Sequence, residues 1–280
     1  MQITFKYQSP QGDVLNIANN ADFVLTDIDG LTSSDVNIST ASVALQDGDT
    51  ITNRRANPRS ITIYCRFLQN ITVETAKRKI LSVIKPKQTG VLTYVHDGRT
   101  VTIDATVENI EMPRFSDAVV MQVTFYCAFP FWQDAAFIVS DIKQVINLHK
   151  FELIVTDSAP IVFGKIGGQT TRNIQNTGDV AVGLQIYIVA LGDFVNPRIE
   201  RTRDGATFKV NVTMAAGDII EINTTRGHKS VTLNGTNVIN DVAGGSNWLQ
   251  LEVGANELTL SDDNNSRAAY MQLKYKRAYV

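Results

Sequence analysis

The sequence predicts a mainly β protein, with an N-terminal β-sandwich that carries one α-helix and a projecting β-hairpin, followed by a second antiparallel β-sandwich. Three observations predict this class. Alternation of apolar and polar residues dominates the chain, a helical period occurs in one segment only, and short strand-like runs separated by turn signals fill the chain after about residue 155. Since domains average about 150 residues, the 280-residue length predicts two domains, 1–150 and 151–280, connected through residues 133–155.

Two long strands are predicted in the first half. Ile61, Ile63, Cys65 and Phe67 alternate with polar residues, and the run 119–129 alternates in the same way. Such alternation is typical of strands with one face on a core. Cys127 lies in the second run, so both cysteines are interpreted as small buried hydrophobes, because neither has a nearby base to activate it as a nucleophile.

The helix is predicted over about residues 72–84. Its apolar residues recur with helical spacing, and Thr72 is suited to cap its N-terminus. Pro86 ends it at or before Lys85. The basic triplet Lys77–Lys79 is interpreted as a solvated face.

A hairpin follows the helix. Asp97-Gly98 stands between the alternating runs 92–95 and 100–103, and this dipeptide tolerates the positive φ angles of a tight turn. We therefore expect two antiparallel strands that meet at Asp97.

Composition argues against several classes of function. The chain has 26 basic and 28 acidic residues, a net charge of −2, whereas duplex binding needs a concentrated field of Lys and Arg. The sequence does not begin with basic residues followed by an apolar run, so it predicts no signal peptide. No apolar stretch reaches the ~20 residues that span a bilayer. We therefore expect synthesis and assembly in the cytoplasm.

The search for catalytic chemistry finds no site, so we expect no enzyme, no cofactor and no metal. The three histidines are isolated, and the glycine-rich run 164–168 lacks the spacing of a phosphate loop. One ligand hypothesis stands: Trp248 follows the polar loop 244–247 and either stacks on a sugar or packs in the sandwich core, and the core is the preferred interpretation.

The order of features resembles a known family. In residues 45–67 a Gly-Asp turn leads through Asn57-Pro58-Arg59 into a strand, and a helix, a hairpin and the aromatic closure Phe129–Trp132 follow. This order resembles the N-terminal domain of the distal tail proteins of long-tailed, siphovirus-type bacteriophages. The runs 176–179, 217–223 and 254–256 resemble the galectin-like C-terminal sandwich of that family.

The resemblance implies a structural virion protein. Distal tail proteins form a hexameric ring at the end of the phage tail, in which N-terminal domains make the ring and C-terminal domains project outward. The implied partners are copies of the chain itself, the major tail tube protein, a tail-associated tip or lysin protein, and receptor-binding or baseplate proteins. The ring leaves a channel through which DNA passes without specific binding.

Within such a ring, we expect the segment from Gln46 to Arg59 and the Asp97 hairpin to contact a neighbouring copy. Both are rich in turn residues and arginines that flank strong strands, and arginine is suited to bidentate pairing across interfaces. The expected contact residues are Arg54, Arg55, Asn57, Arg59, Asp97 and Arg99.

Two alternatives remain open. The first is a carbohydrate-binding module that attaches to host cell-wall polysaccharide, since Phe194-Val-Asn-Pro-Arg198 echoes the galectin motif His-x-Asn-x-Arg, although Phe194 replaces the histidine. The second is a prophage remnant or tail-like bacteriocin that uses the same structural part, which sequence does not distinguish from a phage.

Overall fold

The computed structural model divides into two compact units. It describes residues 3–17, 22–45, 47–68, 72–112, 120–142, 144–147, 164–167 and 171–280. The first unit comprises Met1–Ala135 and Ala278–Val280, and the second comprises Ala136–Arg277. This division differs from the expected one at residue 150, because the segment after Ala135 already pairs with a strand of the second unit and the C-terminus returns to the first.

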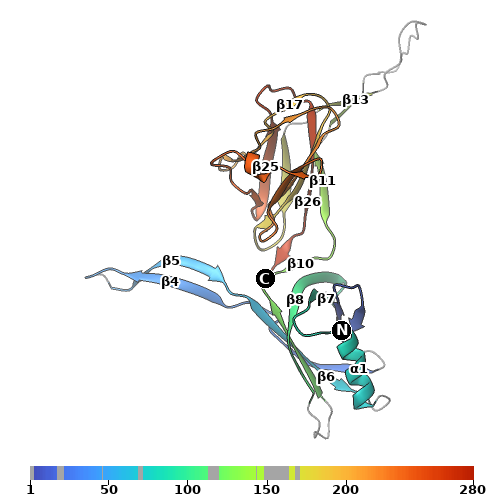
Figure 1. Cartoon of the computed structure of the whole chain (residues 1–280). Coiled ribbons are helices and arrows are strands. Elements are labelled where there is room, and N and C mark those ends of the chain that lie inside the picture. The colour runs from blue at the N-terminus through green and yellow to red at the C-terminus, as the bar shows by residue number, and fades with distance from the viewer. Residues whose placement is uncertain are drawn as a thin grey trace, which may run out of the picture. The chain divides into compact units, whose positions relative to one another are not determined.

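The first unit is built on a nine-stranded antiparallel sheet (Figure 1). Seven of the strands follow the order β2-β1-β7-β8-β9-β6-β3, β10 pairs with β8, and β27 pairs with β10. Its strands are β1 (Thr4–Gln8), β2 (Val14–Asn16), β3 (Phe23–Asp29), β6 (Arg59–Phe67), β7 (Thr89–His96), β8 (Arg99–Glu111), β9 (Val120–Cys127), β10 (Trp132–Asp134) and β27 (Ala278–Tyr279).

This sheet curls around its own core. The rings of Tyr7 in β1 and Phe125 in β9 stack with their centroids 5.3 Å apart, although two other strands separate β1 from β9. In a flat sheet these strands would lie about 14 Å apart. The alternate residues of β6, including Ile61, Ile63 and Cys65, line the enclosed core.

The local predictions for this unit are confirmed. Helix α1 (Val73–Val83) is capped by the Thr72 side chain, which accepts a hydrogen bond from the Thr75 N–H, and Ala76 and Ile80 are its buried residues. The predicted hairpin is formed by β7 and β8, with positive φ angles at Asp97 and Gly98.

The second unit is an antiparallel sandwich. One sheet has the order β11-β26-β16-β21-β22-β23 and the other β14-β25-β18-β19. Their strands are β11 (Ile138–Ile142), β14 (Thr171–Asn176), β16 (Gln185–Ala190), β18 (Arg198–Arg201), β19 (Ala206–Lys209), β21 (Ile219–Asn223), β22 (Ser230–Leu233), β23 (Thr236–Asn237), β25 (Gly254–Ser261) and β26 (Ala269–Tyr275).

Smaller elements complete this unit. They are β12 (Gln144–Asn147) with β13 (Gly164–Gly167), β15 (Val182–Gly183) with β24 (Gln250–Leu251), β17 (Phe194–Val195) with β20 (Thr213–Met214), and the 3-10 helix η1 (Ile239–Asp241). Alternate residues of both large sheets are buried, such as Ile188 and Leu273 from one and Ile199 and Leu258 from the other. Residues 164–167 of the glycine-rich run 164–168 form strand β13, and residue 168 lies outside the described residues.

Candidate assembly interface

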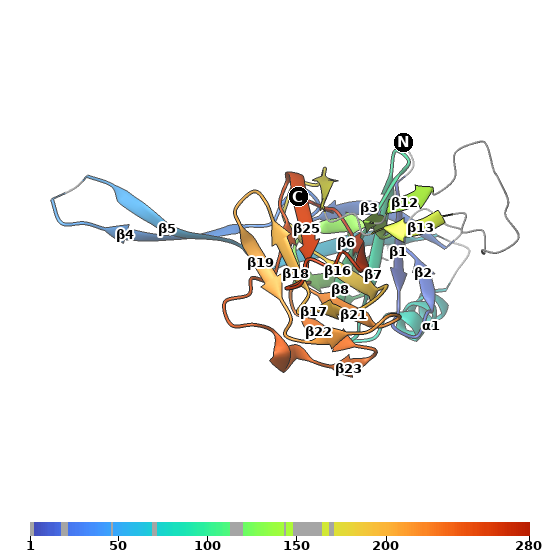
Figure 2. The same cartoon turned by 90° about the horizontal axis from the view of Figure 1, so that it is seen from above.

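A two-stranded ribbon extends from the first unit, as Figures 1 and 2 both show. Strands β4 (Val36–Ser42) and β5 (Asp49–Ala56) pair with each other and form a sheet of their own. Every residue of the two strands is exposed except Ala56, which is half-buried. Leu45, near the turn between them, is fully exposed, and the expected contact residue Gln46 lies outside the described residues. The ribbon therefore has no residue that its own chain buries fully.

The two faces of this ribbon differ in chemistry. The cross-strand pairs Val36↔Ala56, Ile38↔Arg54 and Thr40↔Ile51 share one face. The three large apolar residues of that face, Val36, Ile38 and Ile51, are 46–54% exposed. We call this the apolar ribbon face.

The opposite face is polar. It carries the pairs Asn37↔Arg55, Ser39↔Asn53 and Ala41↔Thr50. Thr52 lies at the irregularity in the register, and its hydroxyl donates a hydrogen bond of 3.0 Å to the Ser39 carbonyl. The alternation of a strand therefore separates Arg54 from Arg55, which the sequence grouped together.

The base of the ribbon is tied to the sheet. The Asn57 N–H donates to the Asp35 carbonyl at 2.8 Å. Gly30 has a φ of 81°, and a Cβ at that position would stand 2.1 Å from the Ser60 carbonyl oxygen, so the chain between β3 and β4 passes directly over β6 where only glycine fits.

Arg59 corrects one sequence expectation. It is 2% exposed, so it does not offer a surface contact to a neighbouring copy. Its Nη1 donates to the Leu31 carbonyl at 3.0 Å, whereas Nε and Nη2 are buried without a hydrogen-bond partner. Burial lowers the pKa of this guanidinium. The first residue of a strand therefore faces inward here, with Cys127 as its cross-strand partner.

The Asp97 hairpin lies elsewhere in the sheet. Asp97 and Arg99 are exposed, and the Arg99 guanidinium carbon lies 3.7 Å from the centre of the Tyr279 ring. The Tyr279 hydroxyl donates to Asp134 at 3.0 Å, so Arg99 covers the C-terminal strand. Among the described residues, no hydrogen bond or ion pair joins this hairpin to the ribbon, and the structure does not unite the two predicted contact regions within one chain.

Trp248 in the second unit is half-buried. Its ring packs against the buried Phe208 ring at 5.0 Å, and the Lys229 ammonium lies 5.1 Å from its centre. The contacts therefore favour a packing role for this residue.

The residues that echo the galectin motif also make contacts within the second unit. Phe194 is buried, the Asn196 amide donates to Asp263 at 2.7 Å, and Arg198 pairs with Glu200 at 2.7 Å. Each residue that matches the motif thus has a structural contact.

The described part of the chain holds no cluster of three or more His, Cys, Asp or Glu residues that could bind a metal. His149 lies outside that part. Burial raises the pKa of both thiols, Cys65 and Cys127, to about 12, which makes them poor nucleophiles. Within the same described part, no helix is long and apolar enough to cross a membrane.

Comparisons with known proteins cover both units. Residues 11–127 match the model of a phage tail protein RIFT-related domain, and residues 177–279 match that of a siphovirus-type tail component, C-terminal domain. No curated protein sequence matches the chain.

Solved structures share the fold. The SPP1 Dit protein, described as a paradigm of the hub adsorption apparatus in phages that infect Gram-positive bacteria, is 13% identical, with a TM-score of 0.72 and full coverage of both chains. A chain of the phage p2 baseplate in its activated conformation with Sr is 11% identical, with a TM-score of 0.52 over 99% of this chain and 98% of that one. The baseplate with Ca gives 12% identity, a TM-score of 0.51 and the same coverage.

Proposed function

Because the chain belongs to the siphovirus distal tail protein family and is a structural component of the tail or baseplate, we propose that its copies close into a ring at the distal end of the tail. The ring joins the tail tube to the tail tip and its receptor-binding apparatus, and its open centre lets DNA pass. Six copies per ring follow from the family resemblance. The observation that carries the proposal is the exposed apolar face of the β4–β5 ribbon.

The ribbon is unusual for a single chain in water. Isolated two-stranded ribbons are marginally stable, and exposed apolar surface on such an element favours association. Val36, Ile38 and Ile51 are about half exposed, so their complete burial against a neighbour would contribute about 3 kcal/mol per copy.

A ribbon that binds a different surface of the next copy makes a heterologous contact. Repeated around an axis, such contacts close into a ring, because each copy then offers one ribbon and receives another. Arg54 lies on the apolar ribbon face and supplies a fixed fork of donors for a carboxylate of the neighbour. Asn57, Asp97 and Arg99 remain proposed contacts at the receiving or flanking surfaces.

The proposed location is the virion, at the distal end of the tail, after assembly in the host cytoplasm. The proposed partners are the major tail tube protein on one side of the ring and a tip or lysin protein and receptor-binding or baseplate proteins on the other. The net charge of −2 is consistent with a channel that does not retain DNA. A prophage remnant or tail-like bacteriocin would use the protein in the same role.

Two adjacent substitutions test this assignment. Ile38→Asp places a charge on the apolar ribbon face, and Ser39→Asp places the same charge on the polar face of the same exposed strand. Light scattering of the purified full chain is expected to show a multimer for wild type and Ser39→Asp, and the 30.8 kDa monomer for Ile38→Asp. Equal masses for the two variants would contradict the role of this face.

A further inference from the structure

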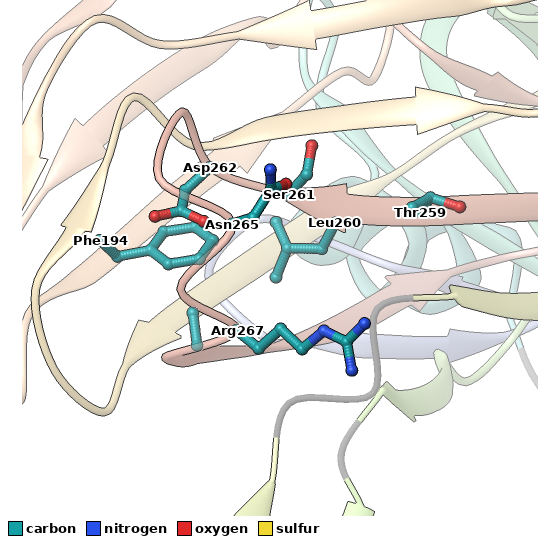
Figure 3. A pocket seen from close by; sticks show the side chains of 8 residues that line it. Phe194, Thr259, Leu260, Ser261, Asp262, Asn265 and Arg267 are labelled. Carbon is teal, nitrogen blue, oxygen red and sulfur yellow. The ribbon is translucent and has the colours of Figure 1, made fainter.

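A pocket opens in the second unit beside the end of β25, and its lining includes Phe194, Asp262 and Arg267 (Figure 3). The Arg267 side chain extends away from the Asp262 carboxylate, one oxygen of which accepts a hydrogen bond of 2.7 Å from the Ser266 N–H. The pocket therefore does not bring opposite charges together for a ligand, and the first unit offers a better matched pair of surfaces.

The turn between β4 and β5 presents apolar side chains to solvent. Val43 is 56% exposed and Leu45 is fully exposed, at the end of a ribbon whose seven-residue strand β4 is about 23 Å long. Leu45 also has a φ of 67°, a left-handed conformation that bulky side chains rarely adopt. The exposed Asp47 and Asp49 follow it. We call these four residues the ribbon tip, which is apolar, acidic and strained.

Helix α1 combines apolar residues with the opposite charge. Val73 and Leu81 are each 39% exposed. Lys77 and Arg78 precede Leu81 by four and three residues, so both lie next to it on the helix surface. We call Val73, Lys77, Arg78 and Leu81 the α1 face. Its apolar and basic groups complement those of the ribbon tip.

The two cations of the α1 face have little use for their charge within the chain. Lys79, the third basic residue of the helix, pairs with Asp22. The described residues give the Lys77 ammonium no ion pair. Arg78 meets Glu74 at 3.7 Å, with both side chains mostly exposed, and such a pair contributes little stability. Lys77 and Arg78 can therefore pair with carboxylates of another molecule.

The ribbon and α1 lie on opposite sides of the first unit, as Figures 1 and 2 both show. In a ring of heterologous contacts, one side of each copy meets a different side of the next, so the ribbon of one copy points toward the α1 side of its neighbour. We propose that the ribbon tip packs on the α1 face of a second copy, with Leu45 against Leu81 and the two tip carboxylates beside Lys77 and Arg78. This contact rests on the ring proposed above and names the surface that receives the ribbon.

Charge reversal in the purified full chain tests the pairing. Asp47→Lys with Asp49→Lys reverses the charge of the ribbon tip, and Lys77→Glu with Arg78→Glu reverses that of the α1 face. Each double variant is expected to weaken self-association about tenfold at low ionic strength, because attraction becomes repulsion. The chain that carries all four substitutions regains opposite charges and is expected to associate like wild type. Analytical ultracentrifugation measures all three variants.

Leu45→Gly separates the apolar contact from the strain. Glycine adopts positive φ angles readily, so the substitution relieves the turn of the free chain. Self-association is nevertheless expected to weaken about tenfold or more, because the burial of a leucine side chain is lost. A residue with only a local structural role would give the opposite result, an unchanged or stronger association.

The control is Arg203→Glu with Arg226→Glu, which makes the same charge change on two exposed arginines of the second unit. It is expected to leave self-association unchanged. A wild-type chain that stays monomeric would contradict the ring and this contact together. A wild-type multimer would leave the ring standing and overturn this contact if neither charge reversal weakened it, if the four-substitution chain associated no better than the double variants, or if Leu45→Gly associated like wild type.

Discussion

Arg54 and Arg55 are consecutive in β5, yet they lie on opposite faces of the β4–β5 ribbon. Arg54 stands opposite Ile38 on the apolar ribbon face, and Arg55 stands opposite Asn37 on the polar one. Only one face of a flat ribbon can be buried against a single neighbouring surface, so the two arginines have different expected roles.

The first prediction follows from this separation. Arg54→Ala should weaken self-association at least tenfold, since it removes a charge-assisted contact worth about 1.5–3 kcal/mol, and Arg55→Ala should change it less than twofold. Analytical ultracentrifugation of the two variants measures this. A larger effect of Arg55→Ala would assign the interface to the polar face.

The second prediction concerns the buried guanidinium of Arg59. Two of its nitrogens lack partners, and replacing buried charge by an apolar side chain of similar size is often neutral or stabilising. Arg59→Met should therefore leave the free energy of unfolding unchanged or raise it by about 1 kcal/mol. Arg59→Ala should lower it by about 2 kcal/mol because a cavity remains. Denaturant unfolding of both variants provides the comparison, and a loss in Arg59→Met as large as in Arg59→Ala would show that the Leu31 hydrogen bond dominates.

The third prediction concerns Trp248. Its contact with Phe208 predicts that Trp248→Ala destabilises the second unit by about 1–2 kcal/mol, less than the cost for a fully buried aromatic residue. Trp248→Phe should recover most of that loss. Thermal unfolding measures the stability of both variants. A Trp248→Ala variant as stable as wild type would contradict the packing role and favour the hypothesis that Trp248 contacts a ligand.

The fourth prediction is a pH dependence. The Arg201 side chain donates to Asp204 and holds the pKa of that carboxyl at about 2, below its ordinary 3.8. Since the folded-state pKa is depressed, this contribution to stability is complete above the unfolded value and is lost as pH falls through about 2. Asp204→Asn should therefore lose less stability than wild type over that interval. If the free energy of unfolding fell equally with pH in both proteins, the Arg201–Asp204 contact would not be the cause of the pH dependence.

Local signals explain what the sequence predicted well. Thr72 caps the helix and Asp97-Gly98 forms the turn, because both structures depend on residues close together in the chain. The alternation in β6 likewise identified a strand with one buried face.

Tertiary context decided the rest. Arg59 continues the alternation of Ile61 and Ile63, so the local pattern places it on the buried face of β6, but its hydrogen bond to the Leu31 carbonyl depends on a loop distant in sequence. The unit boundary depends on pairing between β11 and β26, which are distant in sequence.

The most direct test of the central claim is electron microscopy of the purified full chain over a range of concentrations. The account predicts closed rings in which the Ile38 face of each β4–β5 ribbon is buried against the next copy. Single, unassociated chains at every concentration, with the ribbon still exposed, would contradict it.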